Sequence, residues 1–145
     1  MDNKNYMEVE FKALSINEGF ARICVAGFCV QLNPSIDELG DIKTAVSEAV
    51  TNCIVHAYRD KDGWIYINVS LLEGRVAKIE IKDRGCGIED VKQARMPLFT
   101  TDAESERSGM GFTVMESFTD RMRVKSSVGR GTTVVMQKRI APRMR

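Results

Sequence analysis

The fold of this chain is decided by the stretch 39-LGDIKTAVSEAVTNCIVHAY-58. Its apolar residues recur with a period near 3.6, which predicts one long amphipathic helix with a single buried face. That face holds Leu39, Ile42, Val46, Ala49, Val50, Cys53, Ile54 and Ala57. We expect this helix to be the element against which the rest of the chain packs.

A polar row lies along the edge of that face. Glu48, Asn52 and His56 follow one another at intervals of four residues, so they share one side of the helix. An amide oxygen can bind Mg²⁺, and a carboxylate one turn away can take a proton from an attacking hydroxyl or water. A phosphoryl-transfer site needs both functions, a ligand for the metal ion and a base for the attacking hydroxyl. Taken alone, such a row is more typical of a solvated helix face, so its interpretation depends on the rest of the chain.

The composition is that of one globular domain. The chain has 145 residues, of which 43% are hydrophobic and 28% charged, enough for one sizeable core. Its net charge of +1 predicts no attraction to nucleic acid or to a membrane. No apolar stretch reaches the roughly 18 residues that cross a bilayer. The cysteines lack zinc spacing and the amino terminus lacks a secretory pattern. We expect a reduced, cytoplasmic protein and a single domain over residues 1–145.

The remaining elements follow from periodicity. Alternation predicts strands at 7–13, 64–72, 76–82, 122–127 and 132–139. Helical spacing predicts helices at about 15–32, 35–58, 88–94 and 112–118. Ser15 with Glu18, and Ser35 with Glu38, have the spacing of a capping box. This order predicts an α+β protein, a two-layer sandwich with helices on one face of a mixed, mostly antiparallel sheet.

Two glycine pairs stand where a ligand can approach the backbone. Asp83-Arg84-Gly85-Cys86-Gly87 follows a strand directly, and its carboxylate can accept from an exocyclic amine such as adenine N6. Ser108-Gly109-Met110-Gly111-Phe112 opens a helix, where backbone N–H groups suit phosphate oxygens. Between them, Pro97-Leu98-Phe99-Thr100-Thr101 and Arg107 can form a lid, and Gly131-Thr132-Thr133 enters the last strand. Each pattern alone also fits a turn, a surface loop or a strand start.

The order and spacing of these motifs resemble the GHKL ATPases, a superfamily that includes gyrase and the bacterial histidine kinases. The resemblance implies the Bergerat fold, ATP or ADP bound with Mg²⁺, and a mobile lid at about residues 95–108. Within the superfamily, 42-IKTAVSEAVTN-52, 97-PLFTT-101 and 106-ERSGMGF-112 resemble the sporulation anti-sigma factor kinases. That implies a homodimer that binds a sigma F-like sporulation sigma factor. It also implies that a serine of an anti-anti-sigma factor, a STAS-domain protein, is phosphorylated.

The resemblance also assigns roles. Glu48 is the general base and Asn52 binds Mg²⁺. Asp83 binds the adenine amine, Gly85 and Gly87 give the base room, and Thr132 or Thr133 completes the contacts. The other nucleotide-binding residues it implies are Thr100, Thr101, Arg107, Ser108, Gly109, Met110 and Gly111. Arg22 binds the partner proteins, although a single helical arginine is most often a solvated residue.

Some alternatives stay open at this point. His56 is either a structural hydrogen-bonding residue or a catalytic one. The chain is either a protein-serine kinase or a nucleotide-gated sigma-binding module with little turnover. A detached ATPase domain of the histidine-kinase type is the third interpretation.

Overall fold

The structure is a computed structural model and describes residues 3–96 and 111–142. The described residues form a five-stranded sheet in the order β1-β2-β3-β5-β4. Its strands are β1 (Asn3–Lys12), β2 (Trp64–Leu72), β3 (Val76–Asp83), β4 (Arg121–Ser127) and β5 (Gly131–Arg139). The helices are α1 (Ile16–Cys29), α2 (Ile36–Asn52), α3 (Val91–Ala94) and α4 (Gly111–Ser117). Short 3₁₀ and π segments follow α1 at Val30–Leu32 and α2 at Cys53–Ala57.

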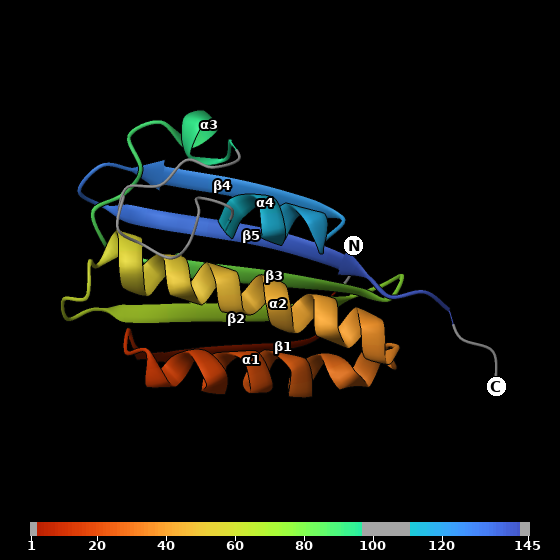
Figure 1. Cartoon of the computed structure of the whole chain (residues 1–145). Coiled ribbons are helices and arrows are strands. Elements are labelled where there is room, and N and C mark those ends of the chain that lie inside the picture. The colour runs from red at the N-terminus through yellow and green to blue at the C-terminus, as the bar shows by residue number, and fades with distance from the viewer. Residues whose placement is uncertain (1–2, 97–110, 143–145) are drawn as a thin grey trace.

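The two-layer α+β architecture is confirmed. Helices α1, α2 and α4 lie on one side of the sheet (Figure 1). Each pair of neighbouring strands is antiparallel, whereas a mixed sheet was expected. The reason is the connection after β3, which leads to the outer strand β4. The β4–β5 hairpin then turns back and inserts β5 beside β3, so no crossover joins two adjacent strands in parallel.

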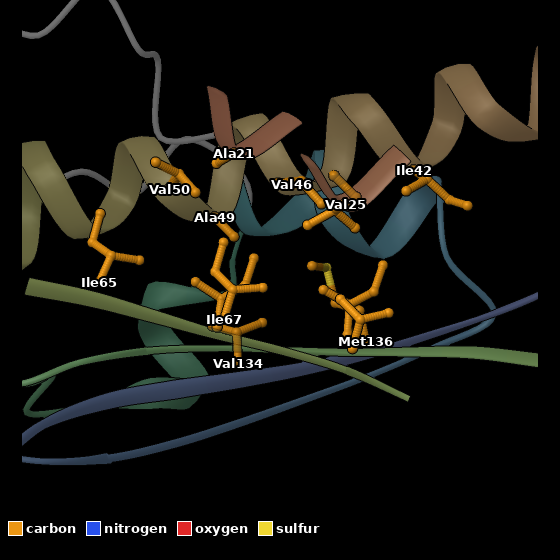
Figure 2. Close-up of a cluster of buried hydrophobic side chains, with 14 of the residues drawn as sticks. Ala21, Val25, Ile42, Val46, Ala49, Val50, Ile65, Ile67, Val134 and Met136 are labelled. Atoms are coloured by element: carbon orange, nitrogen blue, oxygen red, sulfur yellow. The ribbon is translucent and has the colours of Figure 1, made fainter. Parts of the chain in front are cut away.

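One core fills the space between the layers. Side chains of α1 and α2 point towards those of β2 and β5 (Figure 2). Labelled there are Ala21, Val25, Ile42, Val46, Ala49, Val50, Ile65, Ile67, Val134 and Met136, all buried. The predicted apolar face of α2 is therefore the packing face, although Leu39 and Ala57 at its two ends are only half-buried.

The two expected capping boxes have different outcomes. At the start of α2 the box is present: Glu38 N–H donates to the Ser35 hydroxyl at 3.0 Å, and Ser35 N–H donates to Glu38 Oε1 at 2.9 Å. At the start of α1 the prediction was wrong. Ser15 already has helical dihedrals (φ −54°, ψ −35°) and its side chain makes no capping hydrogen bond. Glu18 instead accepts from Arg22 Nη1 at 3.1 Å.

Two predicted helices end earlier or begin later than expected. The long helix changes at Asn52 into the π segment Cys53–Ala57, in which Tyr58 N–H bonds to the Cys53 carbonyl at 3.0 Å. The short helix expected at 88–94 is reduced to Val91–Ala94, because Asp90 has extended dihedrals (φ −128°, ψ 95°) and its carboxylate caps the helix by accepting from Gln93 N–H at 3.0 Å. Among the described residues, no helix is long and apolar enough to cross a membrane.

Candidate functional site

A pocket of about 900 Å³ opens where the end of α2 meets the ends of β3 and β5. This volume is in the range of small-molecule sites. Polar and glycine residues on its wall come from distant parts of the chain: Asn52, His56, Asp83, Gly87, Gly111 and Thr132. Two cysteines, Cys53 and Cys86, line it as well. The fold therefore brings several of the predicted site residues together in one cavity.

Asp83 is the buried carboxylate of this pocket, with only 4% of its surface exposed. Its Oδ1 accepts from Gly85 N–H at 3.0 Å and from Thr132 N–H at 3.2 Å. Burial raises the pKa of the Asp83 carboxyl, while hydrogen bonds from Gly85, the Cys53 thiol and Thr132 act in the opposite direction. The thiol remains a donor, because burial and the nearby Asp83 charge raise the pKa of Cys53 well above its ordinary value. The result is a fixed acceptor facing the cavity.

The loop after β3 is packed tightly between two other segments. Cys86 N–H donates to the Ala57 carbonyl at 3.0 Å, and Gly129 N–H donates to the Cys86 carbonyl at 2.8 Å. A Cβ at Gly85 would overlap the Ala57 carbonyl, and one at Gly87 would overlap the Ser127 carbonyl. In the structure, the space that these glycines leave is filled by protein backbone. The sequence analysis predicted only that Gly85 and Gly87 leave room for an adenine base, and it did not predict these contacts with the protein backbone.

Gly131 gives a direct test of this packing. Its φ is +116°, and a Cβ there would overlap the carbonyl oxygen of Asp83. We expect Gly131→Ala to lower the free energy of unfolding by about 3 kcal/mol or more, since it adds a backbone clash to an unfavourable dihedral. Urea denaturation measures this. Gly129→Ala is the control, because Gly129 also has a positive φ (+80°) but open space around it. Equal losses in the two variants would contradict the packing argument.

Asn52 ends α2 on the other side of the pocket. Gly111, the first residue of α4, lies against it, and a Cβ at Gly111 would be 3.0 Å from Asn52 Oδ1. His56 lines the pocket one turn further on, and its backbone carbonyl accepts from the Cys86 thiol at 3.4 Å. Within the described residues, no group of three or more His, Cys, Asp or Glu side chains is placed to hold a metal ion. A metal here would depend on Asn52 together with oxygens of the ligand.

Glu48 and Arg22 lie outside the pocket wall formed by the described residues. Glu48 is half-buried on α2, one turn before Asn52. Arg22 is held at the contact of α1 with α2, where its Nη1 donates to Glu18 Oε1 at 3.1 Å and to the Ser47 hydroxyl at 3.2 Å. It is therefore a half-buried, tethered residue beside the turn that carries Glu48, rather than a freely solvated arginine.

The structure separates the two threonines that the sequence left open. Thr132 is buried, lines the pocket and has its hydroxyl 2.8 Å from that of Ser126. Thr133 is one residue further along β5 and therefore faces the other side of the sheet, in register with Lys82 and Lys125. Thr100, Thr101, Arg107, Ser108, Gly109 and Met110 lie outside the described residues, as does the expected lid beyond Met96.

Tyr58 is a supporting residue that sequence reasoning missed. Its hydroxyl donates to the Trp64 carbonyl at 2.6 Å and accepts from Arg84 N–H at 2.7 Å. It thereby ties the end of the π segment to β2 and to the residue after Asp83. These partners are 6 and 26 residues away, and no local pattern predicts such a contact.

Comparison with known families gives the class of protein. Residues 14–138 match the model of the histidine kinase-like ATPase domain. The match spans most of the chain, and the chain belongs to this family of ATPase domains.

Curated relatives narrow the class to one family. The chain is 55% identical over 140 residues to an anti-sigma F factor of Caldanaerobacter subterraneus subsp. tengcongensis, covering 97% of each protein. It is 53% identical over 138 residues to that of Priestia megaterium, covering 94% of each. The chain therefore belongs to the anti-sigma F factor family.

Solved structures share the fold. The RsbU and RsbW domains of a Mycobacterium tuberculosis protein align with a TM-score of 0.66 and 17% identity, over 94% of this chain and 32% of that one. The histidine kinase domain of a blue-light activated kinase from Erythrobacter litoralis aligns with a TM-score of 0.58 and 19% identity, over 85% of this chain and 61% of that one. At such identities the likeness concerns the fold.

Proposed function

We propose that this protein is an ATP-dependent protein-serine kinase that also inhibits a sigma factor by binding it. The proposed substrate is a serine of an anti-anti-sigma, STAS-domain protein, and the sigma factor is of the sigma F type. The observation that carries the proposal is the pocket that joins Asn52 of α2 to the buried Asp83 in an ATPase-family fold. The name of the relatives, anti-sigma F factor, supports the choice of partner. Such a protein acts as one domain in the cytoplasm, where transcription occurs.

The residues of the pocket fit a nucleotide. Asp83 offers a fixed acceptor for the exocyclic amine of adenine, and Thr132 lies beside it. Asn52 and Gly111 meet at another part of the wall, where the phosphates would lie. The Asn52 side-chain oxygen would hold Mg²⁺ together with phosphate oxygens and water, and the ion would neutralise phosphate charge.

Phosphate transfer requires a base near the serine hydroxyl. In the proposed reaction the serine oxygen bonds to the γ-phosphorus, Glu48 takes the hydroxyl proton, and the bond to the bridging oxygen breaks to release ADP. Glu48 suits this role because it is ionisable, half-buried and one helical turn from Asn52. Arg22, fixed beside the same turn, is the proposed contact for the partner proteins.

A homodimer formed through β1 and α1 completes the proposal. Among the described strands β1 lies at the edge of the sheet and pairs with β2 alone, so its outer backbone groups can accept another strand. Helix α1 exposes a stripe of apolar side chains, with Ile16 at 83% and Ile23 at 67% exposure. Sedimentation analysis checks the assembly: twice the chain mass is expected, and a monomer at high concentration would contradict it.

Mass spectrometry tests the kinase proposal. The purified protein is incubated with Mg-ATP and a candidate anti-anti-sigma protein, alongside a substrate in which the serine is replaced by alanine. One phosphate on the serine protein and none on the alanine control is expected. If the protein binds the nucleotide but transfers no phosphate, it would be a nucleotide-gated sigma-binding module. That alternative has one observation in its favour, since Glu48 does not line the described part of the pocket. Phosphate on a histidine would indicate a histidine-kinase ATPase domain.

A further inference from the structure

The face of the sheet opposite the helices is divided by charge. Alternate residues of β4 point in opposite directions: Met122 and Val124 pack on the core, while Arg121, Arg123 and Lys125 are exposed on the other face. No described helix covers that face (Figure 1). β4 therefore presents three cations in a row, each two residues from the next.

Strand register extends this row into a patch. Lys82 of β3 lies in the same cross-strand row as Lys125, with Thr133 between them. Lys78 lies in the row of Arg121, with Gln137 between them. We call these residues the basic face: Lys78, Lys82, Arg121, Arg123 and Lys125. The only acidic residue among these rows of β3, β5 and β4 is Glu80, whereas β1 at the opposite edge carries Glu8 and Glu10 on this side.

The cations of the basic face have no acidic partner among residues 3–96 and 111–142, where none of the five belongs to an ion pair. Elsewhere the protein does pair its basic groups, as with Lys138 Nζ and Asp41 Oδ2 at 3.0 Å. A cluster of unpaired like charges on one sheet face carries a repulsive cost, which an anionic partner would remove.

The basic face also contains a hollow of about 300 Å³. It is lined by Arg121, Met122, Arg123, Val135 and Gln137. Two arginines therefore line one shallow hollow, and a guanidinium binds a carboxylate with two parallel hydrogen bonds. Side chains two residues apart on a strand are separated by roughly 6.6 Å, which is the repeat of alternate side chains in any extended peptide.

From this arrangement we propose that the basic face is a docking surface for an extended acidic segment of a partner protein. The carboxylates at alternate positions of such a segment would meet Arg121, Arg123 and Lys125 in turn. The patch lies at the β4 edge, whereas the proposed dimer uses the β1 edge, so both can be occupied at once. It also lies on the other side of the sheet from α2 (Figure 1), and its residues do not line the pocket proposed for the nucleotide.

A nucleic acid fits this surface less well than a peptide. A longer polyanion that crossed the sheet would meet Glu80 and then Glu8 and Glu10. Stacking of bases needs free aromatic faces. On this side Tyr66 is covered by the Arg84 guanidinium, whose central carbon is 4.9 Å from the ring centroid. Among the described residues, the two exposed aromatic residues of this face, Trp64 on β2 and Tyr6 on β1, lie towards the β1 edge and not beside the cations of β4. The size and positive charge of the basic face suit one short, extended, acidic segment of a protein.

Fluorescence anisotropy tests the docking surface. The probe is a short labelled peptide in which Glu alternates with Ser, titrated with the full chain at low ionic strength. Arg123→Glu should weaken binding at least about tenfold, because it places like charges together. Lys61→Glu makes the same change in net charge on the exposed turn before β2, and its effect should stay within about twofold. Nucleotide binding should be unchanged in both variants, which separates this proposal from the kinase proposal.

Two further measurements complete the design. Arg121→Gln with Arg123→Gln removes charge without reversing it, so retained binding in that variant would overturn the proposal even if Arg123→Glu proved unstable. A labelled single-stranded oligothymidylate takes the place of the peptide in a parallel titration. Binding of the oligonucleotide but not of the peptide would overturn the proposal in favour of a nucleic-acid surface. Equal peptide binding by wild type and Arg123→Glu, or none by either, would also overturn it.

Discussion

Replacing Glu48 by glutamine should leave the nucleotide bound and lower the rate of serine phosphorylation by about 10²–10⁴-fold, the usual contribution of a positioned general base. Glutamine keeps the size and the hydrogen-bonding oxygen of glutamate but cannot take a proton at neutral pH. The helix should therefore persist while the proton acceptor is lost. Single-turnover transfer, followed by mass spectrometry, gives the rate, and titration with a fluorescent ATP analogue gives the affinity.

The Glu48 experiment needs a matched variant. Glu116→Gln changes the same chemical group at an exposed position on α4, where Glu116 pairs with Arg95 at 3.2 Å, and it should transfer phosphate at nearly the wild-type rate. If Glu48→Gln lost affinity and rate in equal measure, Glu48 would be a structural residue of the site. If it lost neither, another group would be the base.

Asn52→Ala should weaken Mg²⁺-dependent nucleotide binding by more than about 100-fold, since even outer-shell partners of a metal contribute 10–100-fold. The reason is that the described residues offer no acidic or histidine cluster to replace the missing oxygen. Isothermal titration with and without Mg²⁺ measures the effect. In excess EDTA, wild type and Asn52→Ala should bind the nucleotide with similar, low affinity.

Gln93 provides the comparison for Asn52. It is an amide on α3 that lines the same pocket, but no metal role is assigned to it. In the Gln93→Ala variant, Mg²⁺ should still raise the affinity for the nucleotide as it does in the wild type. A loss of affinity in Asn52→Ala that persisted in EDTA would point to collapse of the wall against Gly111 rather than to a lost ligand.

Local patterns predicted the elements whose ends are set locally. β2 begins at Trp64 and ends at Leu72 as expected, because alternation runs through its whole length. The start of α2 was equally clear, because Ser35 and Glu38 bond to each other without help from other segments. Ser15 has the same spacing to Glu18 but fails as a cap. There the helical conformation begins one residue earlier and Arg22 binds the glutamate.

The site was harder to predict than the fold, because its geometry depends on contacts between distant residues. The sequence indicated Asp83 and Asn52, yet the partners of Asp83 are Thr132, 49 residues away, and Cys53 on the helix. The choice between Thr132 and Thr133 depends on the register of β5 against β3, which a motif does not contain. The interpretation of Gly85 as room for the adenine base stays a prediction; the structure adds that this glycine lets the Ala57 carbonyl, at the end of the π segment, approach closely.

The double hydrogen bond to Asp83 has a thermodynamic consequence. One carboxylate oxygen accepts from Gly85 in the loop after β3 and from Thr132 at the start of β5. The acceptor is therefore in place only when these two strands are paired. A ligand bound there would bind the protein with β3 and β5 paired and not the form in which they are separated, so its binding free energy adds to that of folding. At a concentration 100-fold above its dissociation constant the gain is about 2.7 kcal/mol. Hydrogen exchange in β4 and β5 should slow accordingly when nucleotide is added.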